Sequence, residues 1–425
     1  MKEPLTLYIG TVRRGEFESL LQRDVSVGVI IDTNSSIKLA DLNSFRVVEY
    51  CDYHHIETEL LPLIDRISQR WDISCVLVTH EAYVLPTSYV TQHLGLPGLS
   101  LQAVQFCLDK TKMHRRFVQH AGSKVTARFA HVRSQEDLLT FAQEMGFPLI
   151  LKPANLYNSL FVTLSCSQEE LLANYSQLML SMQEVWQKTD GSVSYPQMQA
   201  EEFLEGTIHA VDCIVDAHGQ VMTTPIVDAI TGREIGWNDF HHFARFTPSR
   251  LSSKQQQDLY QVVIEGVKAL EITSGVAHVE IIQSSQGPKL LEIGARPGGG
   301  RARLFQLSCE FDLMYQYYLV RRGEAYSAPS PSQGKIHPTA IVTPYARQVG
   351  NLSYIAHLAE IQNLPTYRAY EQKIRFGQPV GPSTLGYTSP LTIVLQADDP
   401  EAVYRDLQML QSWSDLFEVV DGVEA

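Results

Sequence analysis

Two glutamates, Glu280 and Glu292, occupy positions where a bound cation would be chemically useful. Residues 276–283 and 289–293 are β-rich runs, and the turn-forming Ser-Ser-Gln-Gly-Pro cluster between them predicts a hairpin. With the turn centred on Gln286, Glu280 lies directly opposite Glu292, with Cβ atoms about 5 Å apart. A hard divalent cation such as Mg²⁺ (or Mn²⁺) removes the repulsion between such carboxylates. A surface hairpin with two solvated glutamates is the alternative, but both residues sit inside otherwise apolar strands.

Three cations suit the binding of phosphate. Arg296 follows Glu292 by four residues, and Pro297 and a run of three glycines come directly after it. Its permanently charged fork could meet a phosphate or a carboxylate. Lys110 lies near an expected helix start and Lys152 ends an apolar strand, so both are suited to phosphates as point charges. For each lysine, a solvated surface position is the alternative.

Composition favours small-molecule chemistry. The chain has 425 residues, which suits two or three domains, and 44% of them are hydrophobic, as in ordinary globular proteins. A formal net charge of −13 disfavours nonspecific binding to nucleic acid or to an anionic membrane. The six cysteines show no C-x-x-C spacing, which argues against a disulfide framework and a zinc site. No apolar run is long enough to span a bilayer and no signal-peptide pattern is present, so we expect a cytoplasmic protein.

The first hundred residues alternate short apolar strands with helices, which predicts a small parallel α/β sheet. The expected strands are 5–9, 25–31, 46–50 and 75–79, and the expected helices are 17–22, 57–71 and 88–94. No G-x-G-x-x-G follows the first strand, so a dinucleotide is not indicated.

Two further regions follow. A central region opens at a helix start around Lys110, and capping boxes at Ser134 and Ser167 predict two more helices. Residues 328–334 have linker composition. The terminal unit beyond them has expected strands near 339–342 and 391–395 and a final helix at 400–410.

Four ordered motifs resemble the ATP-grasp carboxylate–amine ligases, and within that family the amino-acid ligase (dipeptide-forming) branch. The motifs are H-E-A-Y-V-L-P with D-K-T-K-M-H-R-R-F (80–117), G-F-P-L-I-L-K-P-A (146–154), E-E-F-L-E-G (201–206) and H-V-E with L-L-E-I-G-A-R-P-G-G-G (278–300). The resemblance covers about residues 75–320. It implies an ATP-grasp fold of class α/β (α+β), with an N-terminal parallel α/β (pre-ATP-grasp) domain at 1–103, a two-lobed ATP-grasp domain at 104–325 and a small C-terminal α+β subdomain at 335–425.

The resemblance also implies a nucleotide site. Lys110 and Lys152 would meet the α- and β-phosphates of ATP, and Glu280 and Glu292 would hold Mg²⁺. The backbone of Glu201 and Leu204 would bond the adenine edge, with apolar walls around it. The residues assigned to the nucleotide are Lys110, Lys152, Ser159, Glu201, Glu202, Phe203, Leu204 and His209.

The sequence departs from the family pattern at three places. No glycine-rich loop follows Lys152, although Ser159 could donate a hydroxyl and a backbone N–H group to phosphate. Ile208 replaces the glutamate that usually holds the ribose, and His209 or Glu205 could substitute for it. Gly294 replaces an asparagine that usually binds metal.

In related ligases the stretch that corresponds to residues 236–250 lines the substrate pocket. His242 or Arg245 could therefore grip a carboxylate or a phosphate, and the alternative is a solvated loop. Gly299 lies in the glycine run that permits close backbone approach to substrate.

The activity implied is an ATP- and Mg²⁺-dependent ligase that joins a small-molecule carboxylate to an amine through an acyl phosphate, with Arg296 as the catalytic residue. The resemblance leaves a homodimer open as the assembly. One alternative is a biotin-carboxylase-like or carbamoyl-forming enzyme of the same family. The other is a degenerate nucleotide-binding regulatory protein without ligase activity.

Overall fold

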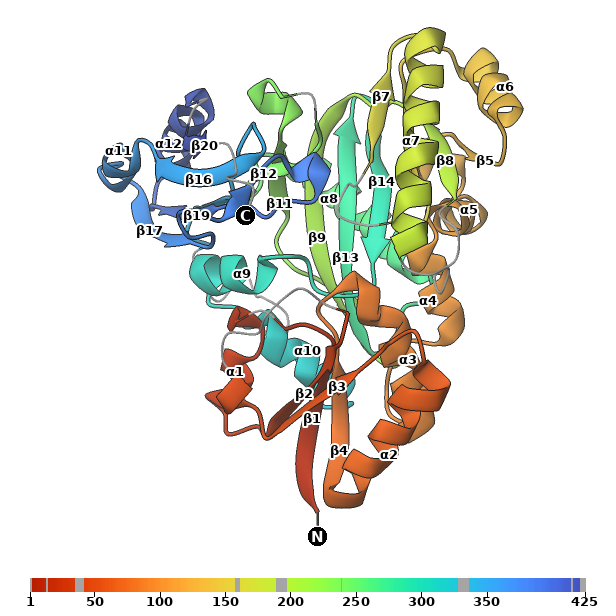
Figure 1. The fold of residues 1–425 in the computed structure, drawn as a ribbon, viewed down its shortest axis with the longest axis vertical. Coiled ribbons are helices and arrows are strands. Elements are labelled where there is room, and N and C mark those ends of the chain that lie inside the picture. Colours follow the sequence, from red (N-terminus) through yellow and green to blue (C-terminus); the bar gives the residue numbers. More distant parts are fainter. Residues whose placement is uncertain are drawn as a thin grey trace.

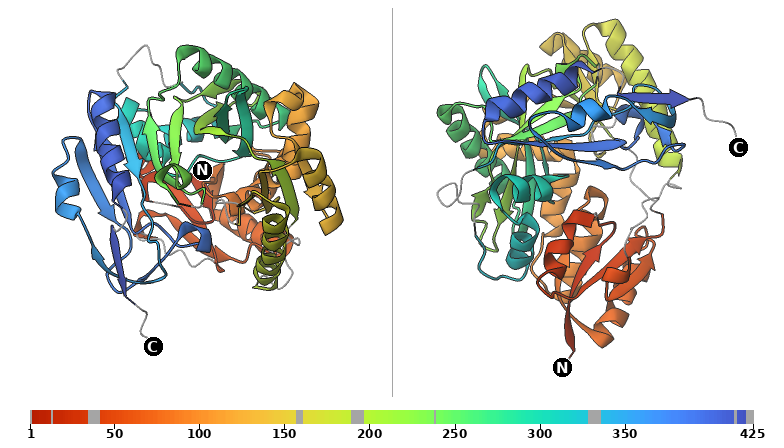
Figure 2. Two further views of the ribbon diagram at one scale, coloured as in Figure 1. Left: turned by 90° about the horizontal axis from the view of Figure 1, so that it is seen from above. Right: turned by 90° about the vertical axis from the view of Figure 1, so that its left-hand side faces the viewer.

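The structure is a computed structural model that describes residues 2–12, 14–34, 42–156, 161–188, 197–237, 239–327, 336–413 and 416–420. It contains four sheets (Figures 1 and 2). The predicted linker at 328–334 lies outside the described residues.

The N-terminal unit is the predicted parallel sheet with helices beside it. Its strands run in the order β3-β2-β1-β4, and every pairing is parallel. The elements are β1 (Glu3–Ile9), α1 (Glu18–Leu21), β2 (Val27–Asp32), β3 (Val47–Cys51), α2 (Leu61–Arg70), β4 (Trp71–Leu77) and α3 (Val84–Leu94). The expected helix 57–71 is helical through Arg70, although residues 56–60 form a wider π-helical turn, and it is wrong only at Trp71, which already pairs with Glu3 in the sheet.

A small antiparallel sheet forms the first part of the central region. Its order is β5-β8-β6-β7, and the long helix α7 lies beside it (Figure 1). The elements are α4 (Leu101–Leu108), α5 (Lys110–Ala121), β5 (Phe129–Val132), α6 (Gln135–Met145), β6 (Leu149–Pro153), β7 (Thr163–Ser165), α7 (Gln168–Lys188) and β8 (Met198–Glu202). Asp109 caps α5 by accepting from the Lys112 N–H group, and Ser134 caps α6, which confirms these predicted helix starts.

The second part of the central region is a large sheet that carries the predicted hairpin. Its order is β14-β13-β9-β11-β12-β15-β19-β17, with β10 beside β9. The elements of this part are β9 (Gly206–Val215), β10 (Val221–Thr223), β11 (Val227–Thr231), β12 (His242–Thr247), α8 (Ser253–Ala269), β13 (Gly275–Ser284), β14 (Gly287–Gly294), α9 (Arg301–Cys309) and α10 (Leu313–Arg321).

The last 90 residues continue this large sheet and add a three-stranded sheet of order β18-β16-β20. The elements are β15 (Thr339–Val342), β16 (Gly350–Ile355), α11 (Leu358–Gln362), β17 (Tyr367–Gln372), β18 (Pro379–Val380), β19 (Leu391–Gln396), α12 (Pro400–Ser412) and β20 (Phe417–Val420). The predicted strands and helix near 339, 391 and 400 are all present. The division at 103, 325 and 335 stays a prediction: α4 runs across the first boundary, and β15 joins the last unit to the central sheet.

The buried core ties the N-terminal unit to the central region. One continuous apolar cluster runs from Leu5 and Ile64 to Leu259 on α8 and Leu290 on the hairpin. A second cluster joins Tyr8 of the N-terminal sheet to Phe305 and Tyr317 on α9 and α10. Burial of this apolar surface holds the N-terminal sheet against the region that carries the candidate site.

Candidate active site

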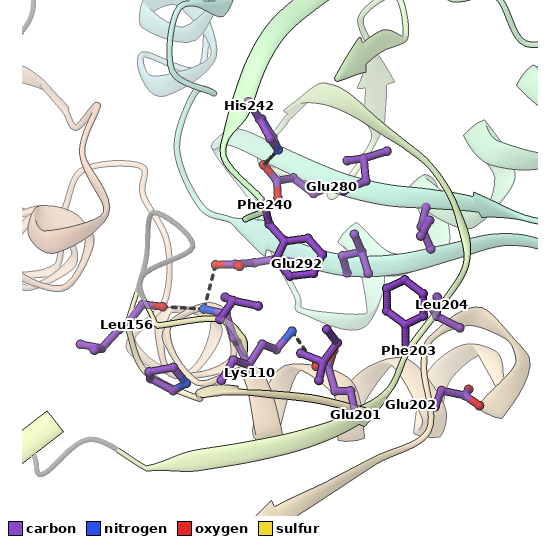
Figure 3. Close-up of a pocket in the computed structure, with 17 residues that line it drawn as sticks. Lys110, Leu156, Glu201, Glu202, Phe203, Leu204, Phe240, His242, Glu280 and Glu292 are labelled. Atoms are coloured by element: carbon purple, nitrogen blue, oxygen red, sulfur yellow. Dashed lines mark hydrogen bonds and ion pairs between the residues drawn. The ribbon is translucent and has the colours of Figure 1, made fainter. Parts of the chain in front are cut away.

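A pocket lies between the small antiparallel sheet and the hairpin β13–β14, and it collects most of the predicted nucleotide and metal residues (Figure 3). Its empty space is about 870 Å³, counting the part that is open to solvent. The lining residues are Lys110, Ile150, Lys152, Pro153, Leu156, Val162, Glu201, Glu202, Phe203, Leu204, Ile208, Phe240, His242, Glu280, Ile282, Leu291 and Glu292.

The two predicted lysines both reach this pocket and both are buried. Lys110, at the start of α5, places its Nζ 3.1 Å from Glu292 Oε1 and donates to the Leu156 carbonyl at 2.6 Å (Figure 3). Lys152, on β6, places its Nζ 2.6 Å from Glu201 Oε1. Each ammonium group is therefore held on a carboxylate of the same pocket, and its contact with phosphate stays a prediction.

The hairpin places Glu280 opposite Glu292, as the sequence predicts. The expected turn is wrong in one detail: β13 and β14 extend to Ser284 and Gly287, so only two residues connect them. Near the turn the two strands therefore pair one position out of the predicted register, with Ile281 opposite Leu290. A bulge that leaves Leu291 without a strand partner restores the predicted register at the two glutamates. The bulge also lets the consecutive residues Leu291 and Glu292 both line the pocket, which the alternation of a regular strand would prevent.

Two histidines lie close to the Glu280 carboxylate. His278 Nε2 lies 3.4 Å from Glu280 Oε1, and His242 Nε2 lies 4.0 Å from the same oxygen. Burial opposes ionisation, but the hydrogen bond and charge of His278 and the charge of Arg301 help to hold the pKa of Glu280 below its usual range.

His278 is fixed in turn by Asp212 on β9, whose carboxylate lies 3.3 Å from His278 Nδ1. Burial lowers the pKa of His278, but Asp212 outweighs burial and raises it overall. For His242, burial wins and lowers the pKa to about 4, against the opposing effect of Glu280.

The pair Glu280 and Glu292 fits a magnesium ion. Within the described ranges no three His, Cys, Asp or Glu side chains are grouped to hold a metal ion by themselves. Mg²⁺ is typically bound by one or two carboxylates together with substrate phosphates and water. Two facing carboxylates beside two lysines suited to phosphate are a donor set of this kind.

The segment after β8 forms the apolar end of the pocket. Phe203, Leu204 and Ile208 line it together with Ile150 and Ile282. Arg233 lies over both Phe203 and Phe240, with its Cζ 5.2 Å and 5.5 Å from the ring centroids. Such walls suit a flat heteroaromatic base, and adenine binding by the backbone of Glu201 and Leu204 stays a prediction.

The side chains of Glu201 and Glu202 face in different directions. Glu201 is buried against Lys152, His114 and Gln199. Glu202 instead accepts hydrogen bonds from the backbone N–H and the guanidinium of Arg128, and in Figure 3 it points away from the pocket centre. Glu201 therefore supports Lys152, whereas Glu202 contributes little charge to the pocket interior.

One predicted nucleotide residue that the structure describes is not brought to the pocket. The structure corrects the prediction for His209, which faces the opposite side of β9 from Ile208. There Asp228 Oδ1 lies 2.8 Å from His209 Nδ1, and Thr207 Oγ1 lies 2.7 Å from His209 Nε2. Side chains alternate along a strand, so Ile208 lines the pocket while His209 is buried away from it. The other alternative for the ribose, Glu205, is exposed and does not line the pocket. Ser159 lies outside the described residues.

Of the predicted substrate residues, His242, Arg245 and Gly299, only the first lines the pocket. Arg245 lies on the same strand and donates to Thr343 Oγ1 at 3.2 Å, and its charge contributes to the low pKa of His242. Gly299 is half-buried just before α9, next to Gly298, whose N–H donates to Asp212 Oδ1 at 2.7 Å.

Arg296 lies beside the pocket and is held from the N-terminal unit. Its Nε lies 2.8 Å from Glu81 Oε2, and its Nη1 donates to the Pro297 carbonyl at 3.0 Å. Burial raises the pKa of Glu81, although Arg296 counteracts part of the effect. Sequence reasoning missed Glu81, Asp212 and the role of His278. The H-E and H-V-E motifs were the available signal, but neither indicates which partners these side chains meet.

Comparison with known proteins agrees with this geometry. Residues 145–303 match the family described as ATP-grasp domain. Alanine–anticapsin ligase of Bacillus subtilis (strain 168) is 26% identical over 288 residues, 64% of this chain and 59% of that protein. D-Alanine–D-alanine ligase of Pseudomonas putida (strain GB-1) is 27% identical over 210 residues, 48% of this chain and 60% of that protein. The chain thus spans about three fifths of the length of these relatives.

The crystal structure of an L-amino acid ligase from Bacillus licheniformis has the same fold. It superposes with a TM-score of 0.76 at 19% identity and covers 99% of this chain and 100% of that one. The chain therefore contains an ATP-grasp domain within an ATP-grasp fold, as the motifs predict. It resembles the carboxylate–amine ligases of that family, and specifically their amino-acid ligase branch.

Proposed function

We propose that the protein is an ATP- and Mg²⁺-dependent ligase that joins the carboxylate of an amino acid or a related acid to an amine. The observation that carries the proposal is one pocket in which Lys110, Lys152, Glu280 and Glu292 surround the same space, with Arg296 beside it and an apolar end suited to adenine. The named relatives support it, since both curated proteins are ligases of amino acids by name.

The proposed reaction overcomes a problem of charge. The substrate carboxylate attacks the γ-phosphorus of ATP, the bond from that phosphorus to the β-phosphate bridging oxygen breaks, and ADP leaves. The amine then attacks the carbonyl carbon of the acyl phosphate, loses a proton, and inorganic phosphate departs. Lys110, Lys152 and Arg296 neutralise the phosphates, which is the main contribution a protein makes to phosphoryl transfer.

Glu280 and Glu292 would hold Mg²⁺ in this proposal, and the bound ion supplies positive charge to the phosphate oxygens. His278 helps to keep Glu280 ionised, and Lys110 lies against Glu292. His242 lines the pocket, Arg245 lies on the same strand, and one of them would grip the carboxylate of the acid.

A panel of acids and amines tests this function. Phosphate and ADP release should require ATP, Mg²⁺, one acid and one amine together. Release that depends on bicarbonate and no amine would instead indicate a carboxylase. Nucleotide binding without turnover on any pair would indicate a regulatory protein. Neither alternative is favoured by the comparisons, in which the curated relatives named are ligases.

The proposal extends to location and partners. None of the described helices combines the length and the apolar character needed to cross a bilayer. All six cysteines are free thiols, which suits a reducing compartment, and the location we propose is the cytoplasm. Small acids and amines are the proposed partners, and homodimer formation stays a prediction.

A further inference from the structure

The N-terminal unit contributes a buried carboxylate to the candidate active site. Glu81 follows β4 and begins a short 3-10 turn at the carboxyl end of the parallel sheet. Only 6% of Glu81 is exposed, although it belongs to the N-terminal unit, which carries none of the predicted catalytic residues. A charged group so deep in the protein requires a partner.

That partner is Arg296. Glu81 Oε2 lies 2.8 Å from Arg296 Nε, and the Pro297 carbonyl accepts from Nη1 at 3.0 Å. These two contacts fix the plane of the guanidinium. Among the described residues no hydrogen bond from Nη2 is present, so this nitrogen is left for another acceptor.

Gly294 provides the space that Glu81 occupies. A Cβ atom built at position 294 would lie 2.8 Å from Glu81 Oε2, which is closer than real Cβ contacts come. The absence of a side chain at 294, which the motif comparison marks as a departure from the family, is therefore what admits the Glu81 carboxylate to this part of the site.

We propose that Glu81 is a positioning residue that orients Arg296 toward the transferring γ-phosphoryl group, so that the N-terminal unit completes the active site. The inference rests on the function proposed above. An arginine side chain has several rotatable bonds, and a group held in its productive orientation before substrate arrives does not lose that freedom during the reaction.

Nucleotide binding tests the proposal without knowledge of the substrate. The dissociation constants of Mg-ADP and of Mg-AMP-PNP, a non-hydrolysable triphosphate, are measured for the wild type, Glu81→Gln, Gly294→Ala and Arg296→Lys. We expect Glu81→Gln and Gly294→Ala to weaken AMP-PNP binding about tenfold, as befits the loss of a hydrogen bond to a charged group, with ADP binding unchanged. Unchanged ADP binding also shows that each variant is folded.

A double variant and a surface control sharpen the result. Glu81→Gln combined with Arg296→Lys should weaken AMP-PNP binding by little more than Arg296→Lys alone, because both changes act on one guanidinium. Glu371→Gln removes an exposed ion pair with Arg303, 2.9 Å apart, and should leave both nucleotides unaffected.

The outcomes separate the inference from the function on which it rests. An unchanged ratio of AMP-PNP to ADP affinity in Glu81→Gln, or losses that simply add in the double variant, would overturn the role of Glu81. A wild type that binds neither nucleotide would overturn the proposed function and this inference with it. A wild type that shows the expected coupling but no turnover with any acid and amine would leave the positioning role intact and remove only the ligase activity.

Discussion

At the scale of single residues, Glu292 is the side chain most important to the proposed magnesium site, because its carboxylate faces Glu280 and also pairs with Lys110. We expect Glu292→Gln to abolish phosphate release, since the amide removes negative charge from the proposed magnesium site while keeping the shape of the side chain. Phosphate release is measured as magnesium is titrated, with Glu280→Gln beside it as a second, less damaging loss. Near wild-type turnover in Glu292→Gln would contradict the metal assignment.

Arg296 offers a second test at the same scale. Arg296→Lys keeps the charge but replaces the planar guanidinium with a compact ammonium group. The ammonium group has fewer N–H donors and lacks the geometry to contact Glu81, the Pro297 carbonyl and a phosphate at the same time. We expect kcat to fall about 100-fold or more, by analogy with the loss of one oxyanion donor. Steady-state kinetics with the identified substrate pair would measure it. A lysine variant that keeps most of its kcat would make Arg296 a local ion pair only.

The site residues that could be predicted are those whose roles depend on local pattern. Lys110, Lys152, Glu280 and Glu292 each stand in a recognisable strand or helix start, and the structure brings all four to one pocket. Glu81 could not be predicted as a partner, because 215 positions separate it from Arg296 and only the packing of the N-terminal sheet joins them. His209 failed for a different reason: which face of β9 meets the pocket depends on the sheet around it.

At the scale of elements, the turn between the hairpin and α9 depends on close contact at Gly298. A Cβ there would overlap the His278 ring and lie 2.7 Å from Arg301 Cγ, in the same place where the Gly298 N–H meets Asp212. We expect Gly298→Ala to destabilise the fold by about 1–3 kcal/mol, the usual range for overpacking a buried site. Urea unfolding measures the change.

Gly275→Ala is the matched control for that experiment. Gly275 is also buried, begins β13, and would place its Cβ at an ordinary 3.6 Å from the nearest atom, the Thr273 carbonyl oxygen. Its free energy of unfolding should change by less than that of Gly298→Ala. Equal losses in the two variants would mean that the contact with His278 is not the cause.

Elements with strong local signals were predictable and those with weak signals were not. The parallel N-terminal sheet, the hairpin and the capped helices α5, α6 and α7 follow from alternation, turn residues and caps. The bulge at Leu291 does not, since it relies on contacts from α5, where His114 Nε2 lies 3.2 Å from the Leu291 carbonyl. Strands β16, β18 and β20 are short and partly exposed, so their sequences carry little apolar pattern.

At the scale of the whole molecule, the proposed chemistry predicts an intermediate that can be trapped. With ATP and the correct acid, hydroxylamine in place of the amine should give a hydroxamate, because the acyl phosphate forms before the amine attacks. The described pocket is lined by cations and carboxylates suited to phosphoryl transfer, and the products should be ADP and phosphate. Colorimetric detection of the hydroxamate and chromatography of the nucleotides measure both. Formation of AMP and pyrophosphate would identify an adenylating enzyme instead.

The continuity of the large sheet into the last 90 residues has a practical consequence for anyone who shortens this chain. Strand β12, which begins with the pocket residue His242, pairs with β15 from Thr247↔Thr339 to Ala244↔Val342. Removal of everything after residue 327 would strip this partner and leave a row of backbone N–H and C=O groups beside apolar side chains such as Phe246. Such an exposed strand edge pairs readily with other chains. A fragment trimmed to the matched ATP-grasp segment is therefore expected to aggregate rather than to report the activity of an isolated catalytic unit.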